Sequence, residues 1–282
     1  MGRNYRHSAP SEFGIVTNDS SAYLGKVAVG SSVSFGLEVA QGDVGGTSFI
    51  HKFGKAPDFD INDGFVTVWD GSDDGDIDQT IYQYSTTADI DTISSSSASD
   101  VQVVEIQGLD SNFLVNLQTA TLAGQASTML VTPLVRVFRM KNIDSSNING
   151  HAYCYVNTTA TAGVPDEPTF VRAIMQPDLN QTLMAVYTVP AGKTAYMSNF
   201  YFGVAGAIKT SAHVMHLIAR PDGQVFQIKH ASSVIADGTS HFQHFYDVPE
   251  VFQEKTDIEM QSDTDTNVAA VAGGFDLTLV DN

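Results

Sequence analysis

The stretch "TLMAVYTVPAGKTAYMSNFYFGV" at residues 182–204 decides the fold class. Its two apolar runs, "TLMAVYTV" and "TAYMSNFYFGV", follow the two-residue period of a half-buried strand. Between them, "PAGK" at 190–193 supplies the proline and glycine of a tight turn. We therefore predict two strands joined as a hairpin.

The same pattern extends on both sides of this stretch. Strand-like runs are separated by turn-rich segments at a spacing near ten residues, which is typical of an antiparallel sandwich or barrel. The predicted fold is all-β, with two antiparallel β-sandwich or jelly-roll-like domains. The runs that carry this prediction are "VQVVEIQGL" (101–109), "NFLVNLQTATL" (112–122), "LVRVFRM" (134–140), "HAYCYVN" (151–157), "AHVMHLIAR" (212–220), "QVFQIKH" (224–230), "SHFQHFYDV" (240–248), "TDIEMQS" (256–262) and "GGFDLTLVD" (273–281).

The domain boundary is predicted at "NTTATAGVPDEPTF" (157–170), where two prolines and small polar residues interrupt the strands. We expect the first domain at 46–163 and the second at 170–282. Residues 1–45 are rich in glycine and serine, with weak alternation, and are interpreted as an N-terminal arm that orders against a neighbour. The alternative for this segment is extra strands of the first domain.

Composition excludes several classes of function. The 282 residues carry a net charge of −18, which repels phosphate backbones and argues against nucleic-acid binding. No run approaches 18 apolar residues and the N-terminus has no apolar signal core, so neither membrane insertion nor secretion is expected. The single cysteine, Cys154, forms no internal disulfide and is predicted to be a buried small hydrophobe.

The acidic stretch "FVTVWDGSDDGDID" at 65–78 is the candidate metal site. Asp70, Ser72 and Asp74 fit the first half of an EF-hand calcium loop, but its twelfth position is Ile81 instead of a bidentate glutamate. An irregular calcium site remains one hypothesis, and a solvated acidic loop after a strand anchored by Trp69 is the other. The candidate calcium ligands are Asp70, Asp73, Asp74, Asp76 and Asp78.

The histidines offer a second metal hypothesis. His213 and His216 are three residues apart, as are His241 and His244, so on a strand each pair points to opposite faces. Only cross-strand pairing, such as His213 with His241, could build a zinc or nickel site. A histidine at a trimer axis, meeting its own copies, is the alternative.

Catalytic motifs are absent from the sequence. It contains no nucleophile elbow, no activating partner beside Cys154 and no complete phosphate-binding glycine motif; "PAGKT" at 190–194 carries only the end of one. We therefore expect a protein that is not an enzyme and has no cofactor. Trp69 beside Asp70 is the one pair that would suit a sugar-binding cleft.

Several stretches resemble virion structural proteins of tailed bacteriophages, especially those of marine and cyanobacterial hosts. The resemblance covers most of residues 50–282 and implies a virion component of β-sandwich domains, made in the host cytoplasm. Its motifs are structural, so no site residues carry over. They are "IHKFGKAPDFD" (50–60), "VWDG" (68–71), "TISSSSASDVQVVEIQGLDSN" (92–112), "VYTVPAGKTAYMSNF" (186–200), "EKTDIEMQS" (254–262) and "GGFDLTLVDN" (273–282).

Three functional hypotheses follow. The first is a capsid decoration or accessory head protein, expected as a homotrimer that binds its own copies and the major capsid protein or other virion proteins. Low charge density and abundant apolar residues suit such symmetric interfaces. The second is a tail or neck component, such as an adaptor or fibre-attachment protein. The third is a carbohydrate-binding β-sandwich module that uses Trp69.

Overall fold

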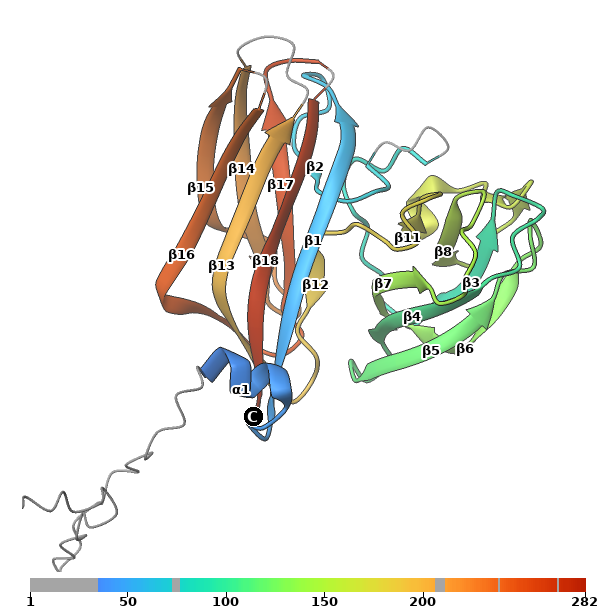
Figure 1. Ribbon diagram of the computed structural model, residues 1–282, viewed down its shortest axis with the longest axis horizontal. Coiled ribbons are helices and arrows are strands. Elements are labelled where there is room, and N and C mark those ends of the chain that lie inside the picture. The colour runs from blue at the N-terminus through green and yellow to red at the C-terminus, as the bar shows by residue number, and fades with distance from the viewer. Residues whose placement is uncertain (1–34, 73–76, 206–210, 238, 268) are drawn as a thin grey trace, which may run out of the picture.

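The structure, a computed structural model, describes residues 35–72, 77–205, 211–237, 239–267 and 269–282. These residues form two lobes of antiparallel sheets, one larger and one smaller, lying side by side (Figure 1). The predicted all-β fold is confirmed. Two short helical segments accompany the strands, an α-helix α1 (Phe35–Gln41) and a 3-10 helix (Pro168–Phe170).

The larger lobe is a sandwich of two sheets. One sheet has the order β1 (Thr47–Phe59), β18 (Ala269–Asp281), β13 (Lys193–Ala205) and β16 (Thr239–Phe252). The other has the order β12 (Val186–Thr188), β17 (Asp257–Thr264), β14 (Ser211–Arg220) and β15 (Gln227–Ala236), with β2 (Val66–Thr67) also pairing with β17.

The smaller lobe encloses a second core between two sheets. One has the order β11 (Val171–Met175), β8 (Ala152–Val156), β3 (Ile90–Ser95) and β6 (Thr128–Leu134), and the other has the order β5 (Val115–Thr121), β4 (Val103–Leu109) and β7 (Arg136–Asn142). A short hairpin of β9 (Ala160–Thr161) and β10 (Val164–Pro165) lies beside them. Cys154 is buried here as predicted, and burial raises the pKa of its thiol to about 12.

Strand β13 shows how the alternation builds the core. Ala195 and Met197 are buried, and after a register shift between Met197 and Asn199 the buried positions become Phe200 and Phe202. An inserted residue of this kind moves the following side chains to the opposite face. The irregularity therefore lets Ala195 and Met197 before it and Phe200 and Phe202 after it pack into the same core.

The predicted hairpin at 190–193 is wrong, although the two strands are present. β12 pairs with β17, whereas β13 pairs with β16 and β18, so the turn carries the chain from one sheet to the other. A two-residue period fixes which side chains are buried but not which strand is the neighbour. The hairpin between β14 and β15, by contrast, is present.

The lobes do not follow the expected division into 46–163 and 170–282. β1 pairs along β18, from Thr47 opposite Val280 to Ala56 opposite Val271, so the first strand belongs to the sheet of the C-terminal half. β11 pairs with β8 in the smaller lobe, beyond the predicted boundary at 157–170. The smaller lobe is thus inserted between β2 and β12, because the two ends of the chain close one sandwich together.

The predicted arm, 1–45, falls mostly on residues 1–34, which lie outside the described residues. Its final part forms α1, which the sequence did not predict. The helix contacts β1 and buries Val39, and it lies beside the C-terminus (Figure 1).

Candidate interaction surfaces

A buried ionic network joins the two lobes. Arg136 of β7 in the smaller lobe donates from Nε and Nη2 to Asp257 of β17 in the larger lobe, at 2.9 and 3.0 Å. Arg220 of β14 donates to the same carboxylate at 2.5 Å. Arg136 also donates to the carbonyl of Ser85 at 2.6 Å, and Thr188 donates to Asp257 at 2.5 Å. Each charge therefore has hydrogen-bonded partners, as burial requires.

Glu259, two residues along β17, extends this network. Its carboxylate accepts hydrogen bonds from Thr67 at 2.5 Å, Tyr84 at 3.0 Å and Gln261 at 2.9 Å. Burial raises the pKa of Glu259. Because these contacts saturate both buried carboxylates with structural partners, the network is interpreted as a lock between lobes.

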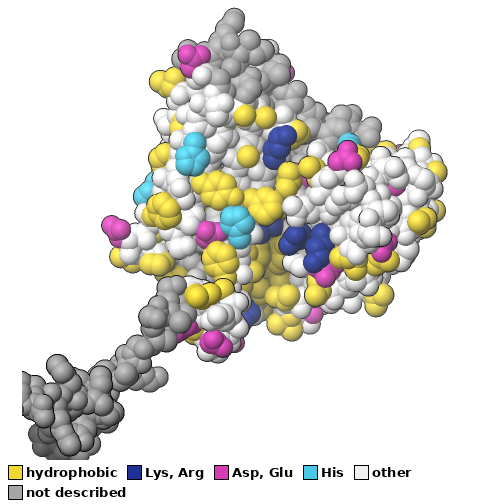
Figure 2. All heavy atoms as spheres, in the orientation of Figure 1, with side chains coloured by type: hydrophobic (Ala, Val, Ile, Leu, Met, Phe, Trp, Pro, Cys, Tyr) yellow, Lys and Arg dark blue, Asp and Glu magenta, His cyan; other side chains and the backbone are white. Residues whose placement is uncertain are grey.

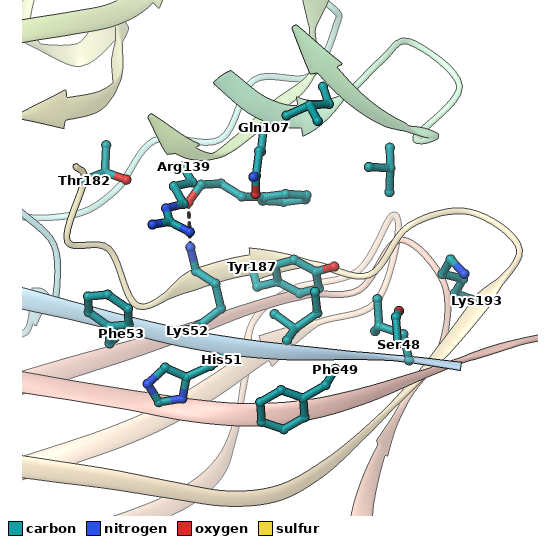
Figure 3. A pocket seen from close by; sticks show the side chains of 15 residues that line it. Ser48, Phe49, His51, Lys52, Phe53, Gln107, Arg139, Thr182, Tyr187 and Lys193 are labelled. Carbon is teal, nitrogen blue, oxygen red and sulfur yellow. Dashed lines mark hydrogen bonds between the residues drawn. The ribbon is translucent and has the colours of Figure 1, made fainter. Parts of the chain in front are cut away.

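A cleft of about 570 Å³ opens beside this lock, between β1 on one side and strands of the smaller lobe on the other (Figure 3). Residues 48–53 of β1 all line it. Successive side chains of a strand point to opposite faces, so six consecutive lining residues mean that the cleft runs along the edge of β1. β1 is the edge strand of its sheet, and within the described ranges its one strand partner is β18.

Two cations lie in this cleft without a carboxylate partner. Lys52 of β1 is only 9% exposed and donates from Nζ to the carbonyl of Phe138 at 2.6 Å. Arg139 of β7 donates to the side-chain oxygen of Gln181 at 2.7 Å. Among the described residues neither cation forms an ion pair. Burial, and secondarily the charge of Arg139, lower the pKa of Lys52 to about 7.

The rest of the cleft is largely apolar. Val115 and Leu117 of β5 are 61% and 60% exposed, and Phe49 of β1 is also exposed. At one end, Lys193 is paired with Asp281. Figure 2 shows lysine and arginine side chains in the hollow between the lobes, next to apolar side chains. The cleft thus combines unpaired positive charge with apolar walls.

Sequence reasoning missed both cations of the cleft. In "IHKFGKAPDFD" the alternation places Lys52 on the same strand face as Ala56, which is buried, so the signal for an inward lysine was present. No comparable signal places Arg139 beside it, because that contact crosses from one lobe to the other.

Two surfaces expose apolar side chains on regular strands. The first, here named the β5–β6 face, continues from the cleft wall formed by Val115 and Leu117 to Met129 and Val131 of β6, and Val131 is 88% exposed. The second surface, here named the β15–β16 edge, belongs to the larger lobe. β16 is the last strand of one of its sheets and β15 is the last strand of the other, at the edge opposite β1 and β12. Its exposed apolar residues are Ile228, Ile235, Phe245 and Val248.

The β15–β16 edge covers a cluster of rings that sequence reasoning did not identify. The rings of His230 and His244 lie 4.8 Å apart, and His230 is also 4.8 Å from Phe200. Tyr246 completes the group, 4.7 Å from His244. Burial, and then the neighbouring His244, lower the pKa of His230. The cluster is therefore interpreted as packing.

The predicted pairing of His213 with His241 is wrong as a cross-strand contact. His213 is buried in β14, opposite Val234 and Thr264, whereas His241 is exposed in β16, opposite Gly203. The two histidines belong to different sheets. Within the ranges that the structure describes, no group of three or more histidine, cysteine or acidic side chains could hold a metal ion.

The acidic stretch divides into a buried and an exposed part. Asp70 is only 2% exposed and accepts a hydrogen bond from the backbone of Leu183 at 2.7 Å, so its place in a solvated loop was wrongly predicted. Asp78 is exposed. Asp73, Asp74 and Asp76 lie outside the described residues, and calcium binding there remains a prediction.

Trp69 is the anchor that the sequence predicted. It is fully buried, and its indole donates to the carbonyl of Gln79 at 3.1 Å. A side chain at Gly71 would meet its ring at 2.4 Å, so only glycine fits there. A tryptophan enclosed in this way cannot present its face to a glycan.

Comparisons with known proteins give no family for the chain. No family model matches it, and no curated protein matches its sequence. Solved structures of infectious bursal disease virus are similar over much of its length. The match to the Gt strain has 11% identity, covers 88% of this chain and 78% of that chain, and has a TM-score of 0.24; the match to the Gx strain has 7% identity, covers 83% and 71%, and has a TM-score of 0.23. The match to the VP2 subviral particle has 9% identity, covers 84% of this chain and 72% of that chain, and has a TM-score of 0.18. Scores this low carry no functional argument. Among the described residues no helix is long and apolar enough to cross a membrane.

Proposed function

We propose that this protein is a structural component of a tailed-phage virion, a decoration or accessory head protein that acts as a homotrimer. The observation that carries the proposal is the pair of apolar surfaces, the β5–β6 face and the β15–β16 edge. Exposed apolar patches on regular strands are typical of protein–protein interfaces. The resemblance of residues 50–282 to virion proteins supports the same role.

Neither surface has the features of a catalytic site. The exposed side chains that define them are apolar. The buried carboxylates of the described residues have structural partners elsewhere: Asp257 and Glu259 in the lock between lobes, Asp70 with the backbone of Leu183 and Asp100 with Ser95. A component with two such surfaces on opposite lobes can contact its own copies with one and another virion protein with the other.

The virion role is tested by densitometry of purified particles. A head decoration protein is expected at hundreds of copies per particle, whereas a tail or neck component is expected at a handful to a few dozen. Absence from the particles would contradict both versions of the proposal.

Self-association is tested by sedimentation of the isolated chain and of surface variants. We expect a species of about three times 30.3 kDa, lost in one of the two variants Val131→Lys and Ile235→Lys and retained in the other. Val101→Lys, which changes another exposed valine outside both surfaces, is the matched control and should leave the species unchanged. A wild-type chain that is monomeric both in solution and on the particle would contradict the trimer.

A further inference from the structure

We propose that the cleft between the lobes binds an extended acidic polypeptide segment, which adds as a strand to the edge of β1 and places a carboxylate between Lys52 and Arg139. The proposal rests on the proposed function for its setting, since the segment would come from another protein of the particle. Binding itself is a property of the isolated chain.

The backbone of β1 supplies the first part of the recognition. Residues 48–53 line the cleft along the free edge of the strand, and in the described residues their strand hydrogen bonds go to β18 alone. An edge strand presents unpaired N–H and C=O groups that pair readily with an added strand. Six residues span about 20 Å, enough for a segment of similar length.

Charge supplies the second part. Lys52 has three N–H donors and uses one on the carbonyl of Phe138, and Arg139 uses its Nη2 on Gln181. Figure 3 shows the two side chains extending toward one another from opposite walls. A buried cation is strongly disfavoured unless it is paired. Lys52 and the partly buried Arg139 form no ion pair among the described residues, and the carboxylates that act on them, Asp70 and Glu105, do so without direct contact. A carboxylate inserted here could pair with both cations directly.

The walls distinguish a peptide from a simple anion. Val115, Leu117 and Phe49 expose apolar surface along the cleft, which side chains of alternating residues in an added strand would cover. Inorganic phosphate would use the cations but neither the walls nor the strand edge. A nucleic acid is disfavoured by the net charge of −18.

The probe is a blocked pentapeptide that alternates leucine and glutamate, titrated into the full chain at pH 6.5 by calorimetry. We expect it to bind at least tenfold more tightly than the same peptide with glutamine for glutamate. A peptide with alternate backbone amides N-methylated should also lose at least tenfold, because it cannot pair with β1. Equal binding of the N-methylated peptide would overturn strand addition.

Variants locate the site. Lys52→Met and Arg139→Gln should each weaken binding of the glutamate peptide at least tenfold, whereas Lys141→Gln should leave it unchanged. Lys141 is the matched control because it lies on the same strand as Arg139 but is paired with Glu105. Thermal unfolding of each variant shows that it is folded.

Three further results would overturn the proposal: no binding of the glutamate peptide by the folded wild type, unchanged binding by Lys52→Met, and full displacement of the peptide by millimolar inorganic phosphate. The last would identify a simple anion site. None of them depends on whether the protein is found in particles, so failure here is distinct from failure of the virion role.

Discussion

The two lobes meet at two groups of buried or partly buried cations, which have opposite kinds of partner. In the lock, Arg136 and Arg220 share the carboxylate of Asp257, with further hydrogen bonds from both lobes. In the cleft, Lys52 and Arg139 have neutral oxygen acceptors but no carboxylate. The junction thus contains one group of cations whose carboxylate partner lies within the chain, and a second group that would gain an ion pair from an added anion. The first holds the lobes together, and the second is suited to binding.

Breaking the lock should produce the largest effect. Asp257→Asn removes the shared negative charge and leaves buried guanidinium groups uncompensated, so the free energy of unfolding should fall by about 3–5 kcal/mol. Urea unfolding measures this. The control is Asp281→Asn, which breaks the more exposed pair with Lys193 and should cost less than about 1 kcal/mol. Equal effects of the two variants would contradict the lock.

Removing the cleft lysine should have the opposite sign. Lys52→Met replaces a buried, unpaired ammonium with an apolar side chain of similar length, so the free energy of unfolding should rise by about 1–3 kcal/mol. Such a gain accompanied by lost binding is the pattern expected where a functional site is retained at a cost in stability. A destabilised Lys52→Met variant would place Lys52 with the lock instead.

The pH dependence sharpens the same contrast. The folded-state pKa of Lys52, about 7, is below its unfolded value of 10.5, so in this range the unfolded chain binds the extra proton. Burial of the Lys52 ammonium therefore destabilises the fold, fully below about pH 7, and this penalty shrinks as pH rises from about 7 toward 10.5. The charged groups that act on Lys52 are Arg139, which lowers its pKa, and Asp70, which raises it.

The advantage of Lys52→Met over wild type should accordingly be larger at pH 6 than at pH 9, by about 3 kcal/mol. Urea unfolding of both proteins at the two pH values gives this difference directly. The other titrating groups are common to both proteins and largely cancel. An advantage that is the same at both pH values would mean that Lys52 titrates normally in the folded chain.

The smallest effects are expected at the exposed apolar surfaces. Val131→Lys should change the free energy of unfolding by no more than about 0.5 kcal/mol, since its side chain is 88% exposed. Denaturation of the dissociated chain tests this separately from assembly. A large loss of stability would show that the β5–β6 face is part of the fold and not an interface.

Much of the local structure could be predicted from the sequence. Alternation in "AHVMHLIAR" correctly indicated β14, the run "QVFQIKH" overlaps the first residues of β15, and Trp69 was correctly placed as a buried anchor. These features depend on side-chain period and turn chemistry over a few residues, which a single sequence records.

What could not be predicted depends on pairing between distant segments. The alternation of residues 47–59 fits a strand of either lobe, and only the register with β18 assigns it to the larger one. The cleft was missed for the same reason, because Lys52 and Arg139 come together only once β1 has joined the C-terminal sheet. Asp70 was misplaced because its partner, Leu183, enters from the other end of the inserted lobe.

The most direct test of the contrast between lock and cleft is a calorimetric titration of wild type and Lys52→Met with the leucine–glutamate peptide at pH 6.5, with thermal unfolding of the same samples. The expected result is a variant that melts higher than wild type and binds the peptide at least tenfold more weakly. A variant that binds as well as wild type, or that melts lower, would contradict the account.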